Sequence, residues 1–399
     1  MLDSFHHWPV RALGELVSFR NGLNFTQAAN GERVKIVGVG DFLDREEIKD
    51  IAALTEGCVA GEVREEETLN DGDLLFVRSN GNKALVGRCA LVRPGSSKVC
   101  FSGFTIRARV TVRDVDAFYL VKLARSEVML RELHRLGSGS SINNLSQDIL
   151  SEVRLPFPPL PEQRRIAGIL RTWDEAIDAA SRLIDAKRRR LDVLRANLLT
   201  PAHRGEGWRM APLGNLTAEG KGRNKGGALG REQVMGVSNA RGVVPMRDAT
   251  IASDLTRYKL LPPQGFAYNP MRINVGSIAM SALDAPVLVS PDYVVFTCRP
   301  KALAPGYLDH FRRTRFWSHY VNAMGSGSVR VRIYYRDLAD IEIPVPGLAE
   351  QKRILRVLDL AAQDLAASET HLDALKRQKR GLMQKLLTGD WRVPAEPAG

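Results

Sequence analysis

The sequence predicts an α+β protein in which two tandem globular domains are separated by two long antiparallel coiled-coil helices, with pseudo-twofold symmetry. Three observations lead to this fold class. The chain has 399 residues, which is more than one ordinary core serves. One stretch recurs at a fixed offset, and two segments carry a coiled-coil pattern. The organisation expected is a first domain at 1–155, a first helix at 156–200, a second domain at 201–345, a second helix at 346–390 and a tail at 391–399.

A tandem repeat is the strongest of these observations. The stretch "LPFPPLPEQRRI" at 155–166 returns as "IPVPGLAEQKRI" at 343–354, which is 188 positions later. Near the two domain starts stand Trp8 and Trp208, and a third tryptophan, Trp391, opens a further cycle that stops. We therefore expect the C-terminal end of the chain to return near the N-terminal start.

Each long helix shows apolar residues at alternating spacings of four and three, which is the seam of a coiled coil. Antiparallel pairing would place Ile166 beside Leu386 and Trp173 beside Lys379, where the lysine would either lie along the indole ring or extend to water. The predicted seam consists of Ile166, Leu170, Trp173, Ile177, Ile184, Leu191, Leu194 and Leu198 in the first helix, and of Ile354, Leu358, Leu365, Leu372, Leu375, Leu382 and Leu386 in the second.

The repeated junction ahead of each helix has a mechanical interpretation. Prolines keep the chain extended before the helix, and Pro161 suits a first helical turn because its missing N–H group would have no partner there. A carboxylate in that turn is favoured by the helix dipole. The junction residues are Pro161, Glu162 and Gln163 in the first copy, and Glu350 and Gln351 in the second.

Strands and shorter helices are expected inside the globular domains. One helix is predicted over 116–136, with a matching helix over 306–324 in the second copy. The expected strands include 33–40, 73–79, 84–92, 104–112 and 292–300.

Composition limits the classes of function. The chain has 57 Lys and Arg against 45 Asp and Glu, a net charge of +12, which favours a nucleic-acid partner. We expect no transmembrane helix, no secretory signal, free thiols in a reducing cytoplasm, and no metal site. The chain has no GxxxxGK[ST] loop, and "GVG" at 38–40 is a weak nucleotide-binding signal whose second copy differs. No catalytic residue is therefore assigned.

Polar and basic loops are the candidate DNA-binding elements. Arginine pairs with guanine and asparagine with adenine in the major groove, while serine, lysine and backbone N–H groups can contact phosphate. The alternative for 78–83 is an ordinary Asn-Gly hairpin turn with a basic flank, and the alternative for 221–227 is a solvated hairpin. The candidate residues are Arg78, Ser79, Asn80, Asn82, Lys83, Ser140, Asn143 and Asn144 in the first domain, and Lys221, Arg223, Lys225, Asn269, Arg272, Asn274, Ser328, Arg330 and Arg332 in the second.

With these motifs in place, the chain over 1–392 resembles the specificity subunit of type I restriction–modification systems. The resemblance rests on "PLPEQRRIAGIL" (159–170) and "GLAEQKRILRVL" (347–358), together with "GDLLFVRSNGNKALVGRCALV" (72–92). Ala349 departs from the motif, which has a proline at that position.

The resemblance implies two target-recognition domains that each read one half of a bipartite, asymmetric double-stranded DNA site. It implies that the helix pair sets the spacer, that the chain itself is not catalytic, and that it holds no cofactor. Two modification subunits would bring S-adenosylmethionine for adenine methylation, and restriction subunits would bring ATP and Mg²⁺. The alternative is a coiled-coil scaffold whose basic domains bind RNA or an acidic protein.

Overall fold

The protein is described by a computed structural model that covers residues 8–25, 31–42, 46–59, 61–136, 144–200, 207–239, 241–324 and 332–393. The chain divides into two compact units. The first unit combines residues 1–179 with 372–399, and the second holds residues 180–371. Each unit therefore contains one globular domain and a part of each long helix.

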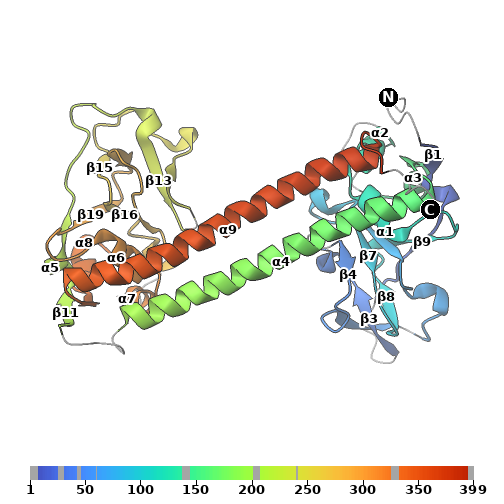
Figure 1. The fold of residues 1–399 in the computed structure, drawn as a ribbon, viewed down its shortest axis with the longest axis horizontal. Helices are drawn as coiled ribbons and strands as arrows, with labels where there is room; N and C mark the ends of the chain where they lie inside the picture. The colour runs from blue at the N-terminus through green and yellow to red at the C-terminus, as the bar shows by residue number, and fades with distance from the viewer. Residues whose placement is uncertain are drawn as a thin grey trace, which may run out of the picture. The chain divides into compact units, whose positions relative to one another are not determined.

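The two longest helices are α4 (Leu160–Leu199) and α9 (Leu348–Thr388). In the first unit the start of α4 lies beside the end of α9, since Ile166 and Leu386 belong to one core. In the second unit the order is reversed, with Leu191 of α4 in one core with Ile354 of α9. The helices are thus antiparallel within each unit (Figure 1), and the predicted fold class is confirmed.

The first globular domain has three α-helices and ten strands within the described residues. The helices are α1 (Ala117–Ala124), α2 (Glu127–Leu136) and α3 (Gln147–Glu152). The strands are β1 (Val10–Ala12), β2 (Val17–Asn21), β3 (Glu32–Val37), β4 (Glu47–Ile48), β5 (Thr55–Val59), β6 (Leu74–Val77), β7 (Cys89–Val92), β8 (Val99–Phe101), β9 (Thr105–Val110) and β10 (Arg154–Pro156).

The second globular domain repeats this inventory with small changes. Its helices are α5 (Leu213–Leu216), α6 (Pro305–Phe311), α7 (Arg315–Met324) and α8 (Tyr335–Ala339). Its strands are β11 (Arg209–Pro212), β12 (Thr217–Glu219), β13 (Val234–Ser238), β14 (Gly242–Pro245), β15 (Lys259–Leu261), β16 (Phe266–Tyr268), β17 (Ile278–Met280), β18 (Val287–Val289), β19 (Val294–Cys298) and β20 (Glu342–Val345).

The sheets of the two units have matching topology. The larger sheet has the order β2-β9-β6-β7-β4 in the first unit and β12-β19-β16-β17 in the second. The smaller sheet is β5-β3-β8 in the first and β14-β13-β18-β15 in the second, and each contains a parallel pair, β3 with β8 or β13 with β18. The two-stranded sheets β1-β10 and β11-β20 join the start of each domain to the strand that precedes its long helix.

The tandem repeat appears in the elements themselves. Helices α6, α7, α8 and α9 and strand β20 each begin 188 residues after α1, α2, α3, α4 and β10. The repeated sequence motif therefore marks a repeat of secondary structure that reaches from α1 to the end of the long helix.

One helix prediction was wrong. The segment 116–136 forms two helices, α1 and α2, and 306–324 likewise forms α6 and α7. The break has the same cause in both copies. The Ser126 hydroxyl accepts a hydrogen bond from the Val128 N–H at 3.2 Å, and the Thr314 hydroxyl accepts one from the Trp317 N–H at 3.4 Å. A hydroxyl that caps a new helix competes with the continuation of the previous one.

All predicted seam residues are buried or half-buried. Lys379 follows neither expected alternative. Its ammonium group makes ion pairs with Asp174 and Glu46, and its side chain is 14% exposed. The chemistry of the neighbouring carboxylates decided its position, because a charge this far from water needs a partner.

The C-terminal end of the chain returns to Trp8, as the third tryptophan predicts. A Cβ atom at Gly389 would lie 3.4 Å from the Trp8 ring, and the Arg392 guanidinium carbon lies 5.7 Å from the ring centroid. Arg392 also donates two hydrogen bonds to the buried Glu162 carboxylate, at 2.9 and 3.0 Å.

Among the described helices, none is long and apolar enough to cross a membrane.

Candidate nucleic-acid interface

The first candidate loop, Arg78–Lys83, follows the fully buried strand β6. The Arg78 N–H donates to the Phe104 carbonyl at 2.8 Å, and the Arg78 carbonyl accepts from the Leu145 N–H at 2.8 Å. Both backbone groups of Arg78 are therefore fixed. Its side chain is half-buried and makes no hydrogen bond or ion pair with any described residue. The arginine is held in place by its backbone, and its guanidinium group has no partner among the described residues.

The two asparagines of this loop have a structural role. The Asn80 side-chain oxygen accepts from the Asn82 N–H at 2.8 Å, and the Asn82 side-chain oxygen accepts from the Ala84 N–H at 3.1 Å. These are Asx turns, in which a side chain takes the place of a backbone acceptor. Their amide N–H groups remain as donors. Ser79 is half-buried and Lys83 is exposed.

The second candidate loop follows β16 and begins at Asn269. The Asn269 side-chain oxygen accepts from the Met271 N–H at 2.9 Å, and its carbonyl accepts from the Arg272 N–H at 3.0 Å. Arg272 and Asn274 are exposed, and Gly276 has a φ of 88°, which favours glycine where the loop turns back into β17. The loop thus presents an arginine and an asparagine to solvent.

A main-chain hydrogen bond anchors both loops in the same way. The Leu145 N–H donates to the Arg78 carbonyl at 2.8 Å, and the Ile333 N–H donates to the Pro270 carbonyl at 3.1 Å. Leu145 and Ile333 are 188 residues apart, so this anchor belongs to the repeat. It places the exposed Asn144 beside the first loop and the exposed Arg332 beside the second. Four further candidates lie outside the described residues, namely Ser140, Asn143, Ser328 and Arg330.

The third candidate loop, 221–227, is separate from the second. The Arg223 guanidinium donates to the Arg257 carbonyl at 2.7 Å, while Lys221 and Lys225 are exposed. The buried Asn224 holds the loop, because its amide group both donates to and accepts from Leu229. Within the described residues, no hydrogen bond joins this loop to the loop that begins at Asn269.

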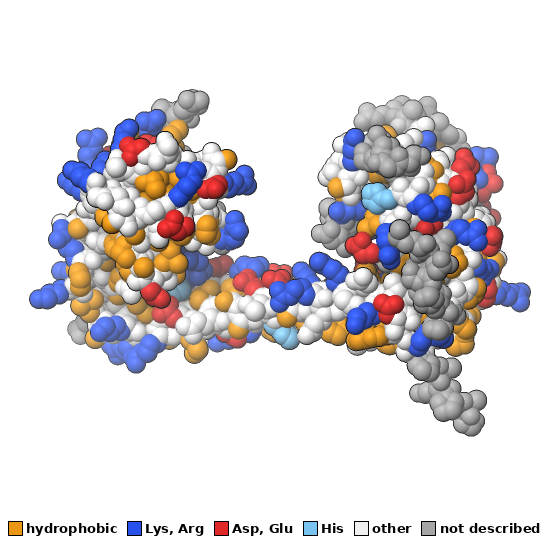
Figure 2. Space-filling model, turned by 90° about the horizontal axis from the view of Figure 1, so that it is seen from above, with side chains coloured by type: hydrophobic (Ala, Val, Ile, Leu, Met, Phe, Trp, Pro, Cys, Tyr) orange, Lys and Arg blue, Asp and Glu red, His pale blue; other side chains and the backbone are white. Residues whose placement is uncertain are grey.

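On the face that Figure 2 shows, positive charge is spread widely rather than concentrated. In the face shown in Figure 2, Lys and Arg side chains are scattered over each globular part, with Asp and Glu between them. The net charge of +12 therefore attracts a polyanion in general, and the anchored loops are the part that could discriminate among sequences.

The junction glutamines lock each domain to its long helix. The Gln163 amide oxygen accepts from the Asp116 N–H at 2.9 Å, and its NH₂ group donates to the Asp114 and Pro158 carbonyls at 2.9 and 2.8 Å. Gln351 makes the same three hydrogen bonds 188 positions later, with Ala304, Ala302 and Pro346. Both side chains are almost fully buried. Three bonds to main-chain groups explain why glutamine recurs in the junction.

The junction glutamates differ between the copies. Glu162 is buried and paired with Arg392, whereas Glu350 is 37% exposed and paired with Arg353 on its own helix. The helix dipole favours both carboxylates, but the sequence pattern did not reveal the distant partner of Glu162.

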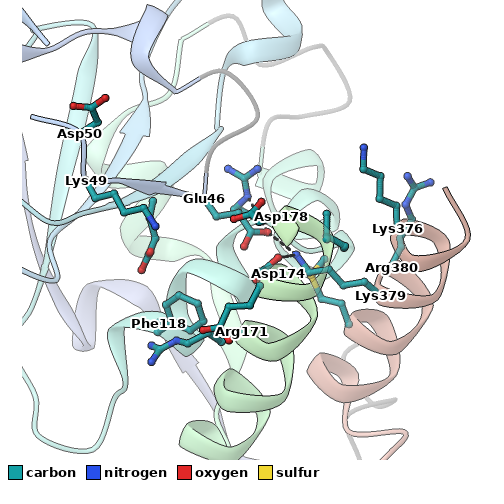
Figure 3. A pocket seen from close by; sticks show the side chains of 15 residues that line it. Glu46, Lys49, Asp50, Phe118, Arg171, Asp174, Asp178, Lys376, Lys379 and Arg380 are labelled. Carbon is teal, nitrogen blue, oxygen red and sulfur yellow. Dashed lines mark hydrogen bonds and ion pairs between the residues drawn. The ribbon is translucent and has the colours of Figure 1, made fainter. Parts of the chain in front are cut away.

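A charged cluster that the sequence did not predict connects the first domain to the long helices (Figure 3). Lys122 of α1 is fully buried and pairs with Glu46 and with Asp174 of α4. Both carboxylates also pair with Lys379 of α9, as Figure 3 shows. Burial by itself would raise the pKa of Glu46, but the two lysines lower it to about 2. The cluster borders a cavity of about 1100 Å³ in the first unit.

In the second unit His310 of α6 takes the place of Lys122. Its Nε2 lies 2.9 Å from Asp359 of α9, and its Nδ1 accepts from the Arg195 guanidinium of α4 at 3.3 Å. Burial lowers the pKa of His310, and the Arg195 charge adds to that effect while Asp359 opposes it. An Nδ1 that accepts a hydrogen bond carries no proton, so Nε2 is the donor to Asp359. The described residues contain no group of His, Cys, Asp and Glu suited to a metal ion.

Comparison with known proteins gives one consistent result. Residues 6–186 match the model of the type I restriction modification DNA specificity domain. Over 413 residues the chain is 23% identical to a Methanocaldococcus jannaschii protein that bears the name MjaX specificity subunit of a type I restriction enzyme, and the match covers 97% of this chain and 94% of that one.

Solved structures share the fold. A chain from a structure of complex assembly and conformational transition in a type I R-M system matches with a TM-score of 0.59 and 20% identity, over 96% of this chain and 98% of that one. The type I restriction-modification S subunit from M. genitalium matches with a TM-score of 0.56 and 14% identity, over 96% of each chain.

The repeated domain and the antiparallel helices form the fold that these solved structures share. The chain resembles the specificity subunits of type I restriction–modification systems over nearly its whole length, and its residues 6–186 match their DNA specificity domain, so the resemblance that the junctions indicated is confirmed. These matches do not support the alternative of a coiled-coil scaffold for RNA or an acidic protein.

Proposed function

We propose that this chain is the DNA sequence-specificity subunit of a type I restriction–modification complex, and that each domain reads one half of a bipartite, asymmetric site. One observation carries the proposal. The same strand-to-loop segment is anchored by the same main-chain hydrogen bond in both domains, but it displays different side chains. The two loops share one main-chain anchor and carry different side chains. This combination suits the reading of two half-sites that differ in sequence.

The side chains supply the chemistry of base reading. Arg78 in the first domain and Arg272 in the second have guanidinium groups that can donate two hydrogen bonds to guanine O6 and N7. Asn144 and Asn274 are exposed amides of the kind that pair with adenine N6 and N7. Lys83, Lys221 and Lys225 are exposed ammonium groups suited to phosphate.

The chain works without catalytic residues of its own in this proposal. Two modification subunits dock beside the long helices and bring S-adenosylmethionine, and they turn the target adenines out of the stack for methylation. Restriction subunits with ATP and Mg²⁺ complete the complex that cuts DNA. The proposed site of action is the cytoplasm, where the DNA lies.

The helix pair sets the length of the unread spacer in this proposal. Helices of 40 and 41 residues are about 60 Å long at a rise of ~1.5 Å per residue. Lengthening α4 and α9 by the same whole number of turns is expected to change the spacer and leave both half-sites intact. An unchanged spacer would remove the ruler from the proposal.

The experiment is co-expression of the chain with its modification subunits, followed by mapping of methylated adenines across the host genome. The expected result is one split motif with two defined halves and a fixed spacer. A complex that assembles but methylates adenines without such a motif would contradict the proposed function.

A further inference from the structure

A repeated turn lies near each of the two anchored loops, which begin at Arg78 and at Asn269. It covers Ser102–Thr105 in the first domain and Ser290–Tyr293 in the second, 188 residues later. In both copies the third residue's N–H donates to the serine hydroxyl at 3.3 Å. In both, the fourth residue's N–H donates to the serine carbonyl, at 2.8 Å in the first copy and 3.0 Å in the second. The two turns therefore have one backbone shape.

Strand pairing places each turn against its loop. Val77 pairs with Thr105, and the next residues along, Arg78 and Phe104, are joined by the 2.8 Å hydrogen bond from the Arg78 N–H. In the second domain Tyr268 pairs with Val294 in the same sheet position. Continuing that register puts Asp292 across from Pro270, where the second loop is anchored. Phe104 thus stands next to Arg78, and the strand register of the second domain directs Asp292 toward the start of the loop that carries Arg272.

That third residue is the one that differs most in chemistry. Phe104 is 61% exposed, although Phe101, which precedes the turn, and Thr105, its last residue, are almost completely buried. Its ring contributes little to the core, and exposing it to water is unfavourable. The equivalent Asp292 is exposed and makes no salt bridge with any described residue. Neither side chain is required by the fold of the turn.

We propose that these turns are a second base-reading element, in which Phe104 contacts the C5-methyl group of a thymine and Asp292 accepts a hydrogen bond from the amino group of a cytosine. The inference rests on the proposed function and names what one position in each domain recognises. Both pairings are ones that the major groove offers. The Lys259 charge acts on Asp292 from within the protein. DNA phosphates repel the carboxylate, so among the groups of DNA a base amino group is the one that gives Asp292 a favourable contact.

The test uses duplexes in which thymine is replaced by deoxyuridine, because this change removes only the methyl group. Binding is measured with the complete modification complex on the methylated motif found for the wild type. For one thymine of the first half-site, deoxyuridine is expected to weaken wild-type binding about fourfold, the effect of one buried methyl group. Phe104→Ala is expected to bind both duplexes equally, and Phe104→Leu to keep part of the preference.

Matched variants separate this contact from general effects. Leu130→Ala removes another exposed apolar side chain of the first unit and is expected to keep the wild-type preference. Asp292→Ala is expected to relax one position of the second half-site and to leave the thymine preference of the first unchanged. A Phe104→Ala complex that still prefers thymine, or a wild type indifferent to every deoxyuridine in the first half-site, would overturn the inference while the split motif stands. A wild-type complex without a split motif would overturn the proposed function itself.

Discussion

Lys122 and His310 occupy the same position of the repeat, yet they join their domains to the long helices by different chemistry. Lys122 is a cation between carboxylates, whereas His310 is an imidazole between the Arg195 guanidinium and the Asp359 carboxylate. The junction glutamines beside them make identical hydrogen bonds in both copies. The comparison teaches that main-chain bonds fix the frame, and that the buried side chain at this position can change from a cation to a neutral imidazole as long as its partners change with it.

Removing the Lys122 charge is expected to give the largest effect. Lys122→Met leaves Glu46 and Asp174 facing each other with less positive charge, and it should lower the free energy of unfolding by about 3 to 5 kcal/mol. Thermal and urea unfolding of the full chain measure this loss. Lys49→Met changes an exposed lysine that lines the same cavity, and it should stay within about 0.5 kcal/mol of the wild type. Equal losses of unfolding free energy in Lys122→Met and Lys49→Met would contradict the role of Lys122 as the buried cation of the cluster.

Replacing the junction glutamines tests the common part of the frame. Gln163→Ala and Gln351→Ala each remove three buried hydrogen bonds, and each should cost about 2 to 3 kcal/mol. The same unfolding measurements check the prediction, with exposed Gln378→Ala as the control. The frame would not be common to both copies if one substitution were harmless and the other severe.

Breaking the Glu162–Arg392 pair tests a contact that one copy has and the other lacks. Arg392→Ala leaves the buried Glu162 carboxylate without its guanidinium partner, which should cost about 1 to 2 kcal/mol. Glu350→Gln changes the exposed counterpart and should cost less than about 0.5 kcal/mol. Comparing the melting temperatures of the two variants measures the difference, and a larger loss for Glu350→Gln would reverse our interpretation.

The smallest expected effect is that of acidification. The contributions of the His310 cluster and of the Glu46 cluster to the stability of the protein should be lost at different pH values. The pKa of His310 is lowered in the fold from an ordinary value of 6.5, so the unfolded chain takes up the proton first and stability falls as pH drops below about 6.5. The Glu46 pKa is lowered from 4.5 to about 2, so its contribution is lost only as pH falls from about 4.5 toward 2. Between pH 5 and 7.5, the free energy of unfolding measured with urea should decrease as the pH drops, and His310→Asn should reduce this pH dependence. The charged groups that face His310 are Asp359, Arg195 and Asp309. If His310→Asn leaves the pH dependence unaltered, other titratable groups are its cause.

The long helices and the repeat were predictable because their signals are local or periodic. A seam such as Ile166–Leu170 and a motif at a fixed offset can be read without knowing any tertiary contact. The break between α1 and α2 was not, because the apolar pattern continues through Ser126 and gives no sign of the two hydrogen bonds that the Ser126 hydroxyl makes there.

Much of the candidate site was beyond sequence reasoning for a different reason. Glu46, Lys122, Asp174 and Lys379 come from four distant segments, and each residue alone resembles an ordinary surface charge. The anchor between Leu145 and Arg78 joins two main-chain groups, which any residue but proline on the donor side could supply. Basic and amide residues in loops indicated where to look, but they did not show that Asn80 and Asn82 shape the loop.

The main-chain anchors of the two loops have a consequence for how such a protein changes over generations. Because the Leu145 N–H and the Ile333 N–H hold carbonyl groups, exposed side chains that make no hydrogen bond within these loops, such as Lys83 and Asn274, can be replaced with little effect on the fold. A lineage can therefore acquire a new preference in one domain while the other keeps its own, and each such step yields a protein that still folds and assembles. Point mutations in these loops can therefore change the DNA target while the protein still folds.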